Sequence, residues 1–191
     1  HRMVTKQVSF YEEMTNVPFI IAGPGIHPRQ KPVEDLLTQP TIDLLPTLCE
    51  LAGIPVPSSK PGISLAPFLK GEKQKRQHPY AASEWHSEYE VTVSPGRMIR
   101  SPRYKYTHYL EGNGEELYDM LKDKGERRNL AHDPKYSKIL AEHRALLDDY
   151  IRRTQDDYRS LKVEADKRWR SHAPGYPNHE GPCARDIINR K

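Results

Sequence analysis

The chain has 191 residues, enough for one domain or a large part of one. Its 30 basic and 26 acidic residues give a net charge of +4, and the two signs are well mixed, so no nucleic acid is expected as a partner. Cys49 and Cys183 lack metal-ligand or Cys-x-x-Cys spacing, and two cysteines are too few for a disulfide framework. All apolar runs are far shorter than the roughly 18 residues of a transmembrane helix, so no membrane span is expected.

Residues 1–25 predict a polar loop that leads into a buried strand. The run Phe19–Ala22 is apolar and rich in β-branched residues, and Gly23-Pro24-Gly25 closes it. His1 and Lys6 lie in the preceding loop, where polar groups that lead into a buried strand often mark a site, although a solvated loop fits the same residue types. Because the chain begins inside this loop, we expect it to be a piece of a longer protein.

Two helices are predicted next. Residues 40–53 form the first, with Pro40 in its first turn and Gly53 at its end, and Pro46 predicts a kink or a tight first turn. Helical spacing predicts a buried apolar face made of Ile42, Leu45, Leu48, Cys49 and Ala52. A second, short helix is expected between Ser64, which can cap it, and Gly71.

From about residue 79 the pattern changes to short strands. Their hairpin spacing predicts a small antiparallel sheet with strands over 80–85, 97–100, 104–109 and 116–120. In the third strand, alternation places Tyr104, Tyr106 and His108 on one face and Lys105, Thr107 and Tyr109 on the other. A helix over about 134–157, capped by Asp133, carries an apolar stripe that predicts it covers one sheet face: Tyr136, Ile139, Leu140, Leu146, Leu147, Tyr150 and Ile151.

The order of these motifs resembles the sulfatase family of the alkaline-phosphatase-like superfamily. The motifs that carry the resemblance cover residues 1–158: His1, Lys6, Tyr11-Glu12, Val17-Pro18 and Pro24-Gly25; Asp43–Leu48 and Ala52–Pro55; Gly62–Leu65; Arg100–Tyr106; Glu116–Asp119; Glu126 and Asn129-Leu130. The resemblance implies an α/β fold of α+β character. Residues 1–78 are expected to end a catalytic α/β domain, residues 79–158 to form the antiparallel-sheet subdomain with its covering helix, and residues 159–191 to form a tail.

The resemblance also implies a reaction, the hydrolysis of a sulfate ester or sulfamate, and by family habit a sulfated small molecule or glycan as substrate. The family uses a formylglycine nucleophile made from a Cys/Ser-x-Pro-x-Arg motif, and a Ca²⁺ ion held by Asp and Asn or Gln oxygens. Neither cysteine fits that motif and no Asp-Asp or Asp-His-Gly loop is present, so no metal ligands are expected in this chain. Both are expected in a missing N-terminal part of the same protein, without which this segment is expected to be inactive, and a periplasmic or secreted location is expected.

Five residues are candidates for the site by this resemblance. Lys6 is expected to donate hydrogen bonds to a sulfate oxygen and His1 to contact the substrate or leaving group. His86 could contact the non-reacting part of the substrate, and Arg97 and Arg100 could bind further anionic groups of a sulfated sugar. Surface solvation or ordinary charge on a strand face is the structural alternative for each of them.

Two other functions fit the sequence. The first is a metal-dependent hydrolase of the same superfamily that acts on phosphate or phosphonate esters. The second is a non-catalytic module that binds anionic glycans or nucleic acid through the basic and aromatic stretch 97–109, although strand alternation also explains those tyrosines as packing residues.

Overall fold

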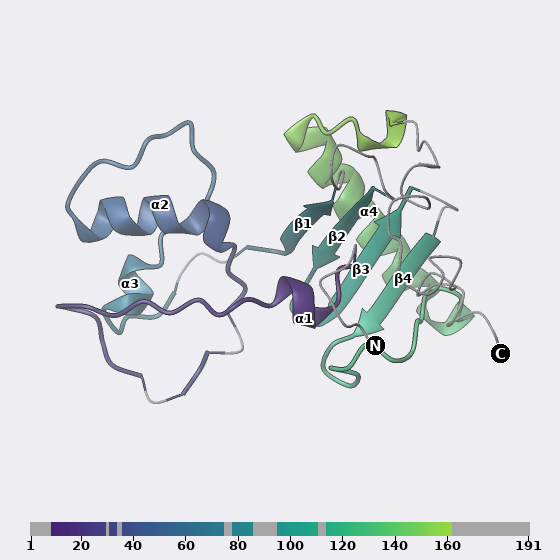
Figure 1. Ribbon diagram of the computed structural model, residues 1–191, viewed down its shortest axis with the longest axis horizontal. Helices are drawn as coiled ribbons and strands as arrows, with labels where there is room; N and C mark the ends of the chain where they lie inside the picture. Colours follow the sequence, from purple (N-terminus) through teal and green to yellow (C-terminus); the bar gives the residue numbers. More distant parts are fainter. Residues whose placement is uncertain are drawn as a thin grey trace, which may run out of the picture.

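The computed structural model describes residues 9–29, 31–33, 36–74, 78–85, 95–110 and 114–161. A four-stranded sheet with a long helix forms one part of the molecule, and two helices joined by long connections form the other (Figure 1). The predicted mixed α/β architecture, with an antiparallel sheet and a C-terminal helix, is therefore confirmed. No helix of the described ranges is long and apolar enough to cross a membrane.

The sheet has the strand order β1-β2-β3-β4, and every neighbouring pair is antiparallel. Its strands match the predicted ones within two residues at each end: β1 (Ala81–Trp85), β2 (Gly96–Arg100), β3 (Tyr104–Tyr109) and β4 (Gly114–Asp119). The register sets Ile99 opposite Tyr106 and Tyr106 opposite Leu117. These three side chains therefore form a continuous apolar row across one face of the sheet.

The long C-terminal helix covers that face, as predicted. A short 3-10 turn, η2 (Pro134–Tyr136), opens it, and the Asp133 side chain accepts a hydrogen bond from the backbone N–H of Lys135 at 3.1 Å. The helix α4 (Ser137–Thr154) then places Leu140 and Leu147 against the apolar row. Each fully buried Leu or Ile side chain in such a core stabilises the fold by about 1.5–3 kcal/mol.

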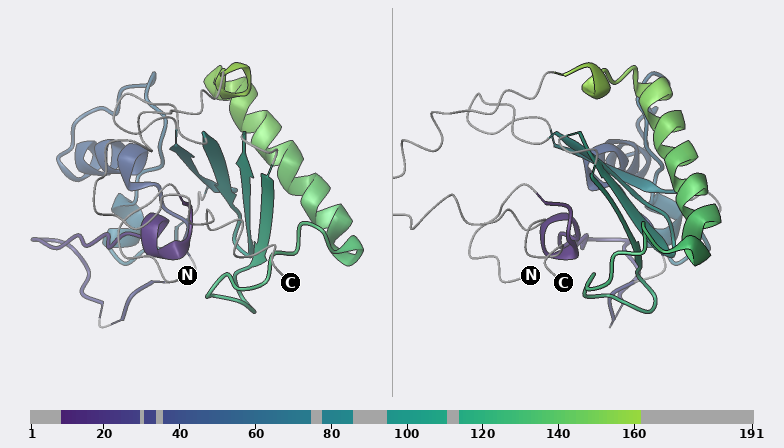
Figure 2. Two further views of the ribbon diagram at one scale, coloured as in Figure 1. Left: turned by 45° about the vertical axis from the view of Figure 1, so that its right-hand side comes forward. Right: turned by 90° about the vertical axis from the view of Figure 1, so that its right-hand side faces the viewer.

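The first described residues, 9–15, lie on the opposite face of the sheet, and we call them the opening segment. A short helix, α1 (Glu12–Thr15), follows Phe10 and Tyr11, both of which are buried. Phe10 packs with Met98 and Tyr109, and Tyr11 packs with Tyr118 and Met120. Figure 2 shows α1 and α4 on opposite sides of the strands. The alternation predicted for the third strand is confirmed, because Tyr106 faces α4 whereas Lys105 and Tyr109 face the opening segment.

Polar groups from outside the sheet form hydrogen bonds with the backbone of both edge strands, β1 and β4. On β4, the Asn129 amide accepts from the backbone N–H of Leu117 at 3.0 Å and donates to the carbonyl of Glu115 at 2.9 Å. The backbone N–H of Leu130 donates to the carbonyl of Leu117 at 2.8 Å. On β1, the backbone N–H of Ala82 donates to the side-chain oxygen of Gln39 at 2.9 Å.

The first predicted helix is present as α2 (Pro40–Leu51), and it continues through Pro46. Its buried face is different from the predicted one, because Asp43, Pro46 and Thr47 are buried while Leu45 and Leu48 are about half exposed. The polar face is buried because the segment before the short helix α3 (Ala66–Leu69) hydrogen-bonds to it. The backbone N–H of Ile63 donates to Asp43 Oδ1 at 2.8 Å, and that of Leu65 donates to Thr47 Oγ1 at 3.0 Å.

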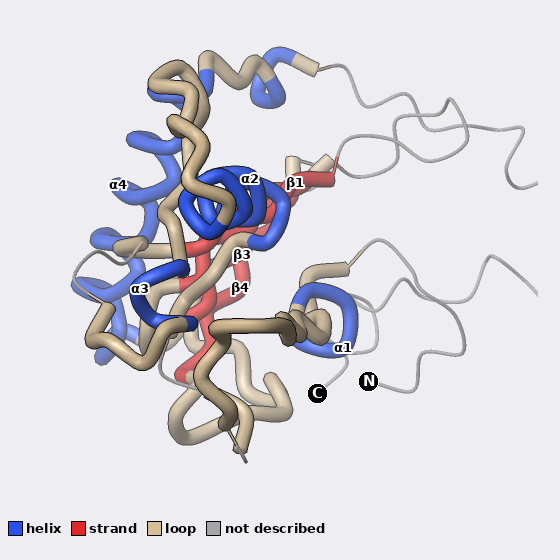
Figure 3. Tube along the Cα trace, turned by 90° about the vertical axis from the view of Figure 1, so that its left-hand side faces the viewer, coloured by secondary structure: helices blue, strands red, loops and turns tan. Residues whose placement is uncertain are grey.

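The strand predicted over Phe19–Ala22 is not formed, and Ile20 is 87% exposed. Figure 3 draws this segment as a loop, and Figure 1 shows that it leaves α1 and runs away from the sheet. A strand is stable only when another strand satisfies its backbone hydrogen bonds, and none of the described segments pairs with this run. The prediction of a buried strand is therefore wrong for this chain taken by itself.

One buried histidine links α4 to the sheet. His143 Nδ1 lies 2.8 Å from the carbonyl of Ile139 and Nε2 lies 2.9 Å from Ser101 Oγ. Because a carbonyl can only accept, Nδ1 donates, and the neutral ring then accepts from the Ser101 hydroxyl at Nε2. Burial lowers the pKa of His143 below its ordinary value of 6.5, while the Ile139 carbonyl and Glu142 act in the opposite direction.

We expect this histidine to make the sheet subdomain less stable in mild acid. His143 takes up a proton near pH 6.5 in the unfolded chain and only at a lower pH in the folded chain. The contribution of the neutral ring to the free energy of unfolding is therefore fully present above pH 6.5, and it is lost as the pH falls below 6.5 through the lower pKa of the folded chain. The variant His143→Gln should show a flatter dependence of the melting temperature between pH 7 and pH 5. The exposed His132→Gln should keep the slope of the unmodified chain, and an equal slope in both variants would contradict the prediction.

Candidate functional site

The structure describes two of the five candidate site residues, Arg97 and Arg100, and it places them apart. His1, Lys6 and His86 lie outside the described residues. Arg97 and Arg100 are three positions apart on β2, so they project from opposite faces of the sheet. Arg97 contacts residues that follow α4, whereas Arg100 lies on the side of the opening segment. Their predicted roles in substrate binding stay predictions.

Arg97 is the centre of a buried polar cluster at the end of α4. Its Nε and Nη2 donate to the two carboxylate oxygens of Asp156 at 2.6 and 2.9 Å, and its Nη1 donates to the carbonyls of Trp85 and Gly96, each at 2.8 Å. The guanidinium also lies 4.5 Å from the centre of the Tyr158 ring. The side chain is 3% exposed, so this Arg holds the 3-10 turn η3 (Tyr158–Ser160) against the sheet.

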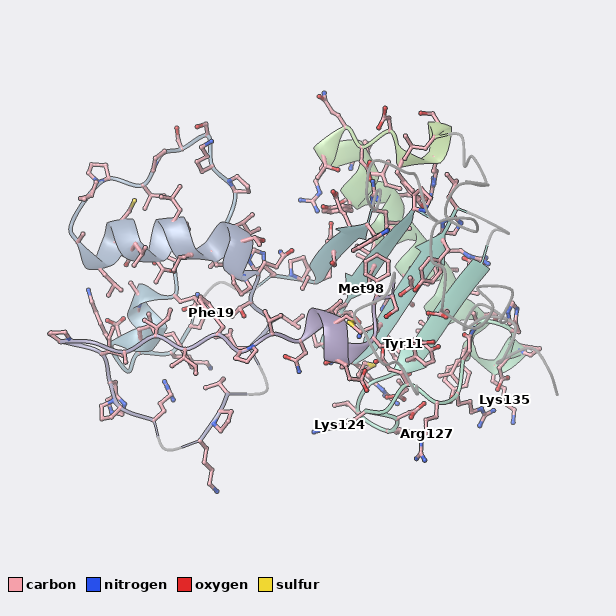
Figure 4. The ribbon with its side chains drawn as sticks, in the orientation of Figure 1. Tyr11, Phe19, Met98, Lys124, Arg127 and Lys135 are labelled. Carbon is pink, nitrogen blue, oxygen red and sulfur yellow. The ribbon has the colours of Figure 1, made fainter. Side chains whose placement is uncertain are left out.

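A second buried polar cluster lies on the other face, where the opening segment meets the sheet. We call Glu12, Lys105 and Glu126 the anchor cluster. Lys105 Nζ lies 2.6 Å from Glu12 Oε1 and 2.9 Å from Glu126 Oε1, and it donates to the carbonyl of Phe10 at 2.8 Å. Glu126 Oε2 accepts from the backbone N–H of Glu12 at 2.7 Å. Tyr11, which is labelled in Figure 4, precedes Glu12 in the sequence and packs against the sheet.

The charges of the anchor cluster are balanced by their neighbours. Burial raises the pKa of the Glu126 carboxyl, and the Lys105 ammonium opposes this shift. Arg100 adds a second positive charge, with its Nε 4.0 Å from Glu12 Oε1. Burial lowers the pKa of Arg100, and the carboxylates of Glu12 and Glu126 act against that shift. Two cations therefore face two carboxylates in a region that is largely closed to water.

The sequence reasoning did not assign a role to Lys105 or Glu126. Strand alternation predicts the correct face for Lys105, together with Thr107 and Tyr109, and a charged residue among such neighbours needs a buried partner. In the sequence, Glu126 belongs to a motif in a turn-rich stretch, which by itself indicates no partner. Its partner is distant in sequence, 114 residues from Glu12, and no local pattern indicates such a contact.

The resemblance implies two groups, a Ca²⁺ ion and a formylglycine nucleophile. Among the residues that the structure describes, no group of three or more His, Cys, Asp or Glu side chains could hold a metal ion. Cys49, a partly buried free cysteine on α2, is followed by Glu-Leu-Ala-Gly and does not fit the formylglycine motif. The described part of the chain therefore does not fit either group.

Comparison with known proteins gives several matches. The family model N-sulphoglucosamine sulphohydrolase, C-terminal, matches residues 1–153. A Delta 4,5-hexuronate-2-O-sulfatase of Bacteroides thetaiotaomicron is 76% identical over all 191 residues, which span 40% of its length. The solved structure of a 2-O GAG sulfatase is 77% identical with a TM-score of 0.86, over 98% of this chain and 40% of that one.

A more distant structure supports the same assignment. A protein solved in complex with its substrate D-glucosamine-2-N,6-O-disulfate is 27% identical with a TM-score of 0.55, over 63% of this chain and 25% of that one. The chain thus spans less than half of the length of each of these relatives. Because a C-terminal sulfatase family model matches four fifths of its length, the chain belongs to the sulfatase family and corresponds to its C-terminal region.

Proposed function

We propose that the chain is the C-terminal part of a sulfatase that hydrolyses a sulfate ester of a sulfated glycan. The observation that carries the proposal is the 76% identity over the whole chain to a Delta 4,5-hexuronate-2-O-sulfatase. That degree of identity favours the same substrate class, a sulfate ester at O2 of an unsaturated hexuronate. Its nucleophile and its Ca²⁺ ligands would come from the N-terminal part of the protein.

The exposed apolar surface supports a larger catalytic domain. Most of the exposed large apolar side chains among the described residues come from the part of the chain before the sheet: Val17, Ile20, Val33, Leu44, Leu45, Leu48, Ile54 and Val56. In Figure 4, Phe19 of the same part lies away from the sheet, near α2 and α3. We propose that residues 1–78 complete the catalytic α/β domain, where Phe19–Ala22 pairs with a strand of the N-terminal part. Residues 79–158 would then form the separate sheet subdomain and residues 159–191 the tail.

Lys6 has the central role in the proposed reaction. Charge develops on the sulfate oxygens as the ester bond breaks, and a fixed ammonium that donates hydrogen bonds to one of them stabilises that charge. His1 would contact the substrate or the leaving group from the same loop. His86, Arg97 and Arg100 remain candidates for contacts with the rest of the glycan, although the Arg97 guanidinium is buried and donates to Asp156 and to the carbonyls of Trp85 and Gly96.

The full-length protein should release sulfate from a 2-O-sulfated Δ4,5-unsaturated disaccharide and not from its 6-O-sulfated counterpart. Replacing Lys6 with alanine should lower kcat by about 100-fold or more, the loss found when one donor to a developing oxyanion is removed. The exposed Lys135→Ala, at the start of η2 on the sheet subdomain, is the matched control and should keep full activity (Figure 4). Near-normal turnover by Lys6→Ala would rule out its proposed role.

The same assay separates the two alternatives. Faster hydrolysis of a phosphate or phosphonate monoester than of the sulfate ester would favour the phosphoesterase alternative. The glycan-binding module would need several exposed cations on the stretch 97–109, but Arg97 is 3% and Lys105 1% exposed, and the exposed Arg103 is paired with Asp119 at 2.7 Å. Their burial supports the packing explanation of that stretch over the binding module.

A further inference from the structure

We propose that Lys105 and Glu126 are positioning residues for Lys6, the proposed sulfate-binding lysine of this protein. The anchor cluster fixes the backbone of residues 10–15 on the sheet, and Lys6 precedes Phe10 by four residues in the sequence. The inference rests on the proposed function, because it gives Lys105 a task only if Lys6 binds sulfate.

Lys105 uses its ammonium group to hold one short stretch of chain. It contacts the carbonyl of Phe10, the carboxylate of Glu12 and, at 3.4 Å, the hydroxyl of Thr15. All three contacts come from α1 and the residues directly before it, and only Glu126 comes from elsewhere. The direction of each contact fixes the position of α1 along the strands as well as its distance from the sheet.

Glu126 completes the fixation through the backbone. Its carboxylate bridges the Lys105 ammonium and the backbone N–H of Glu12. Glu126 adopts a left-handed conformation with φ of 48°, which glycine would adopt without steric cost. The backbone strain at Glu126 is therefore offset by the contacts of its carboxylate. Both described contacts, to Lys105 Nζ and to the backbone N–H of Glu12, lie within the anchor cluster.

An apolar contact next to the cluster fixes the same segment independently. Phe10 packs on Met98 and Tyr109, with ring centres of Phe10 and Tyr109 5.8 Å apart. A Cβ atom added at Gly96 would lie 2.7 Å from the Phe10 ring, so the ring occupies the space that a side chain at this position would take. The segment is thus held by directional polar contacts at Glu12 and by shape at Phe10.

Such a rigid attachment matters because of the distance to the proposed catalytic group. Lys6 precedes Phe10 by four residues, so the chain places it within about 14 Å of this attachment. A buried ion cluster adds little stability compared with apolar residues of the same volume. It does provide fixed geometry, and displacement of a catalytic group by about 1 Å can cost about 100-fold in rate. We therefore assign to the cluster the placement of Lys6 rather than the stability of the sheet.

The test uses the full-length protein and the 2-O-sulfated disaccharide. The variant Lys105→Met/Glu126→Gln removes both buried charges together, and the partly exposed Glu12 keeps Arg100 as a neighbouring cation. We expect kcat to fall by about 10-fold to 100-fold, and amide hydrogen exchange over residues 10–16 to accelerate while that of α4 is unchanged. The control Arg144→Met/Glu115→Gln removes an ion pair between α4 and the other face of the sheet and should keep full kcat.

A double-mutant comparison distinguishes positioning from general damage. If the cluster acts through Lys6, adding Lys105→Met/Glu126→Gln to Lys6→Ala should cause almost no further loss of kcat, whereas independent effects would multiply. Glu12→Gln, whose side chain is partly exposed, is a second variant that should fold and show a smaller loss of the same kind. Unchanged kcat in both anchor variants, or multiplying losses, would overturn the proposal. Absence of sulfatase activity in the unmodified protein would instead refute the proposed function.

Discussion

Replacing Arg97 with alanine should destabilise the sheet subdomain by about 3–5 kcal/mol, the range measured when one partner of a buried ion pair is removed. The variant leaves the Asp156 carboxylate without the two hydrogen bonds that Arg97 donates to it. It also leaves the carbonyl of Trp85 without the Nη1 donor at 2.8 Å. The loss should be visible as a lower urea midpoint and as faster amide exchange in β2 and η3.

Two further variants define the origin of this effect. Arg97→Lys keeps the charge but cannot form the two parallel hydrogen bonds to Asp156, so an intermediate loss is expected. Arg152→Ala removes an Arg–Asp pair from the surface of α4, where Arg152 is 75% exposed, and should cost about 0–1 kcal/mol. Equal stability of Arg97→Ala and Arg152→Ala would show that the buried pair contributes no more than the surface pair.

Replacing Gly62 with alanine should have an effect of similar size in the other part of the molecule. Gly62 has φ of +116°, and a Cβ atom there would lie 2.1 Å from the carbonyl oxygen of Ile42. The neighbouring hydrogen bonds to Asp43 and Thr47 hold the loop against α2, so the loop cannot move away without breaking them. We expect a loss of about 4 kcal/mol, the range of severe steric changes in protein interiors.

Two other glycines supply matched controls for this prediction. Gly53 has φ of +68° but open space around it, so Gly53→Ala should cost only about 1–2 kcal/mol for the backbone conformation. Gly23 has open space and no left-handed conformation, so Gly23→Ala should be close to neutral. Limited proteolysis between residues 54 and 62, together with melting curves, should rank the variants in this order. A Gly62→Ala protein as stable as Gly53→Ala would contradict the close approach to Ile42.

The four-stranded sheet and the helix that covers it were predictable because their signals are local. Alternation within 104–109 and the turn signal at 112–114 specify strands and faces, and the spacing of Leu140 and Leu147 specifies the covering face of α4. The start of that helix followed from Asp133 and Pro134. Each of these patterns depends on residues that are close together in the chain, and the structure satisfies them inside the same subdomain.

The region before the sheet was predicted less well, for two physical reasons. The apolar faces of Phe19–Ala22 and of α2 are patterns that specify burial but not the partner that provides it, and the described chain leaves Ile20 and Leu48 exposed. The anchor cluster depends on a contact across 114 residues, which no periodicity indicates. Arg97 and Arg100 could have been separated from the sequence alone, since three positions along a strand lead to opposite faces.

The hydrogen bonds at the two edges of the sheet have a consequence for how copies of this protein behave at high concentration. An edge strand with free backbone groups is a template on which another chain can add a strand and begin to aggregate. On β4 the side chain of Asn129 and the backbone of Leu130 already use the groups of Glu115 and Leu117 that such a strand would need. Gln39 uses the backbone N–H of Ala82 on β1 in the same way. The sheet is thereby protected against the addition of a strand from a second molecule. The variant Asn129→Ala should therefore aggregate more readily than the unmodified protein while it keeps its fold.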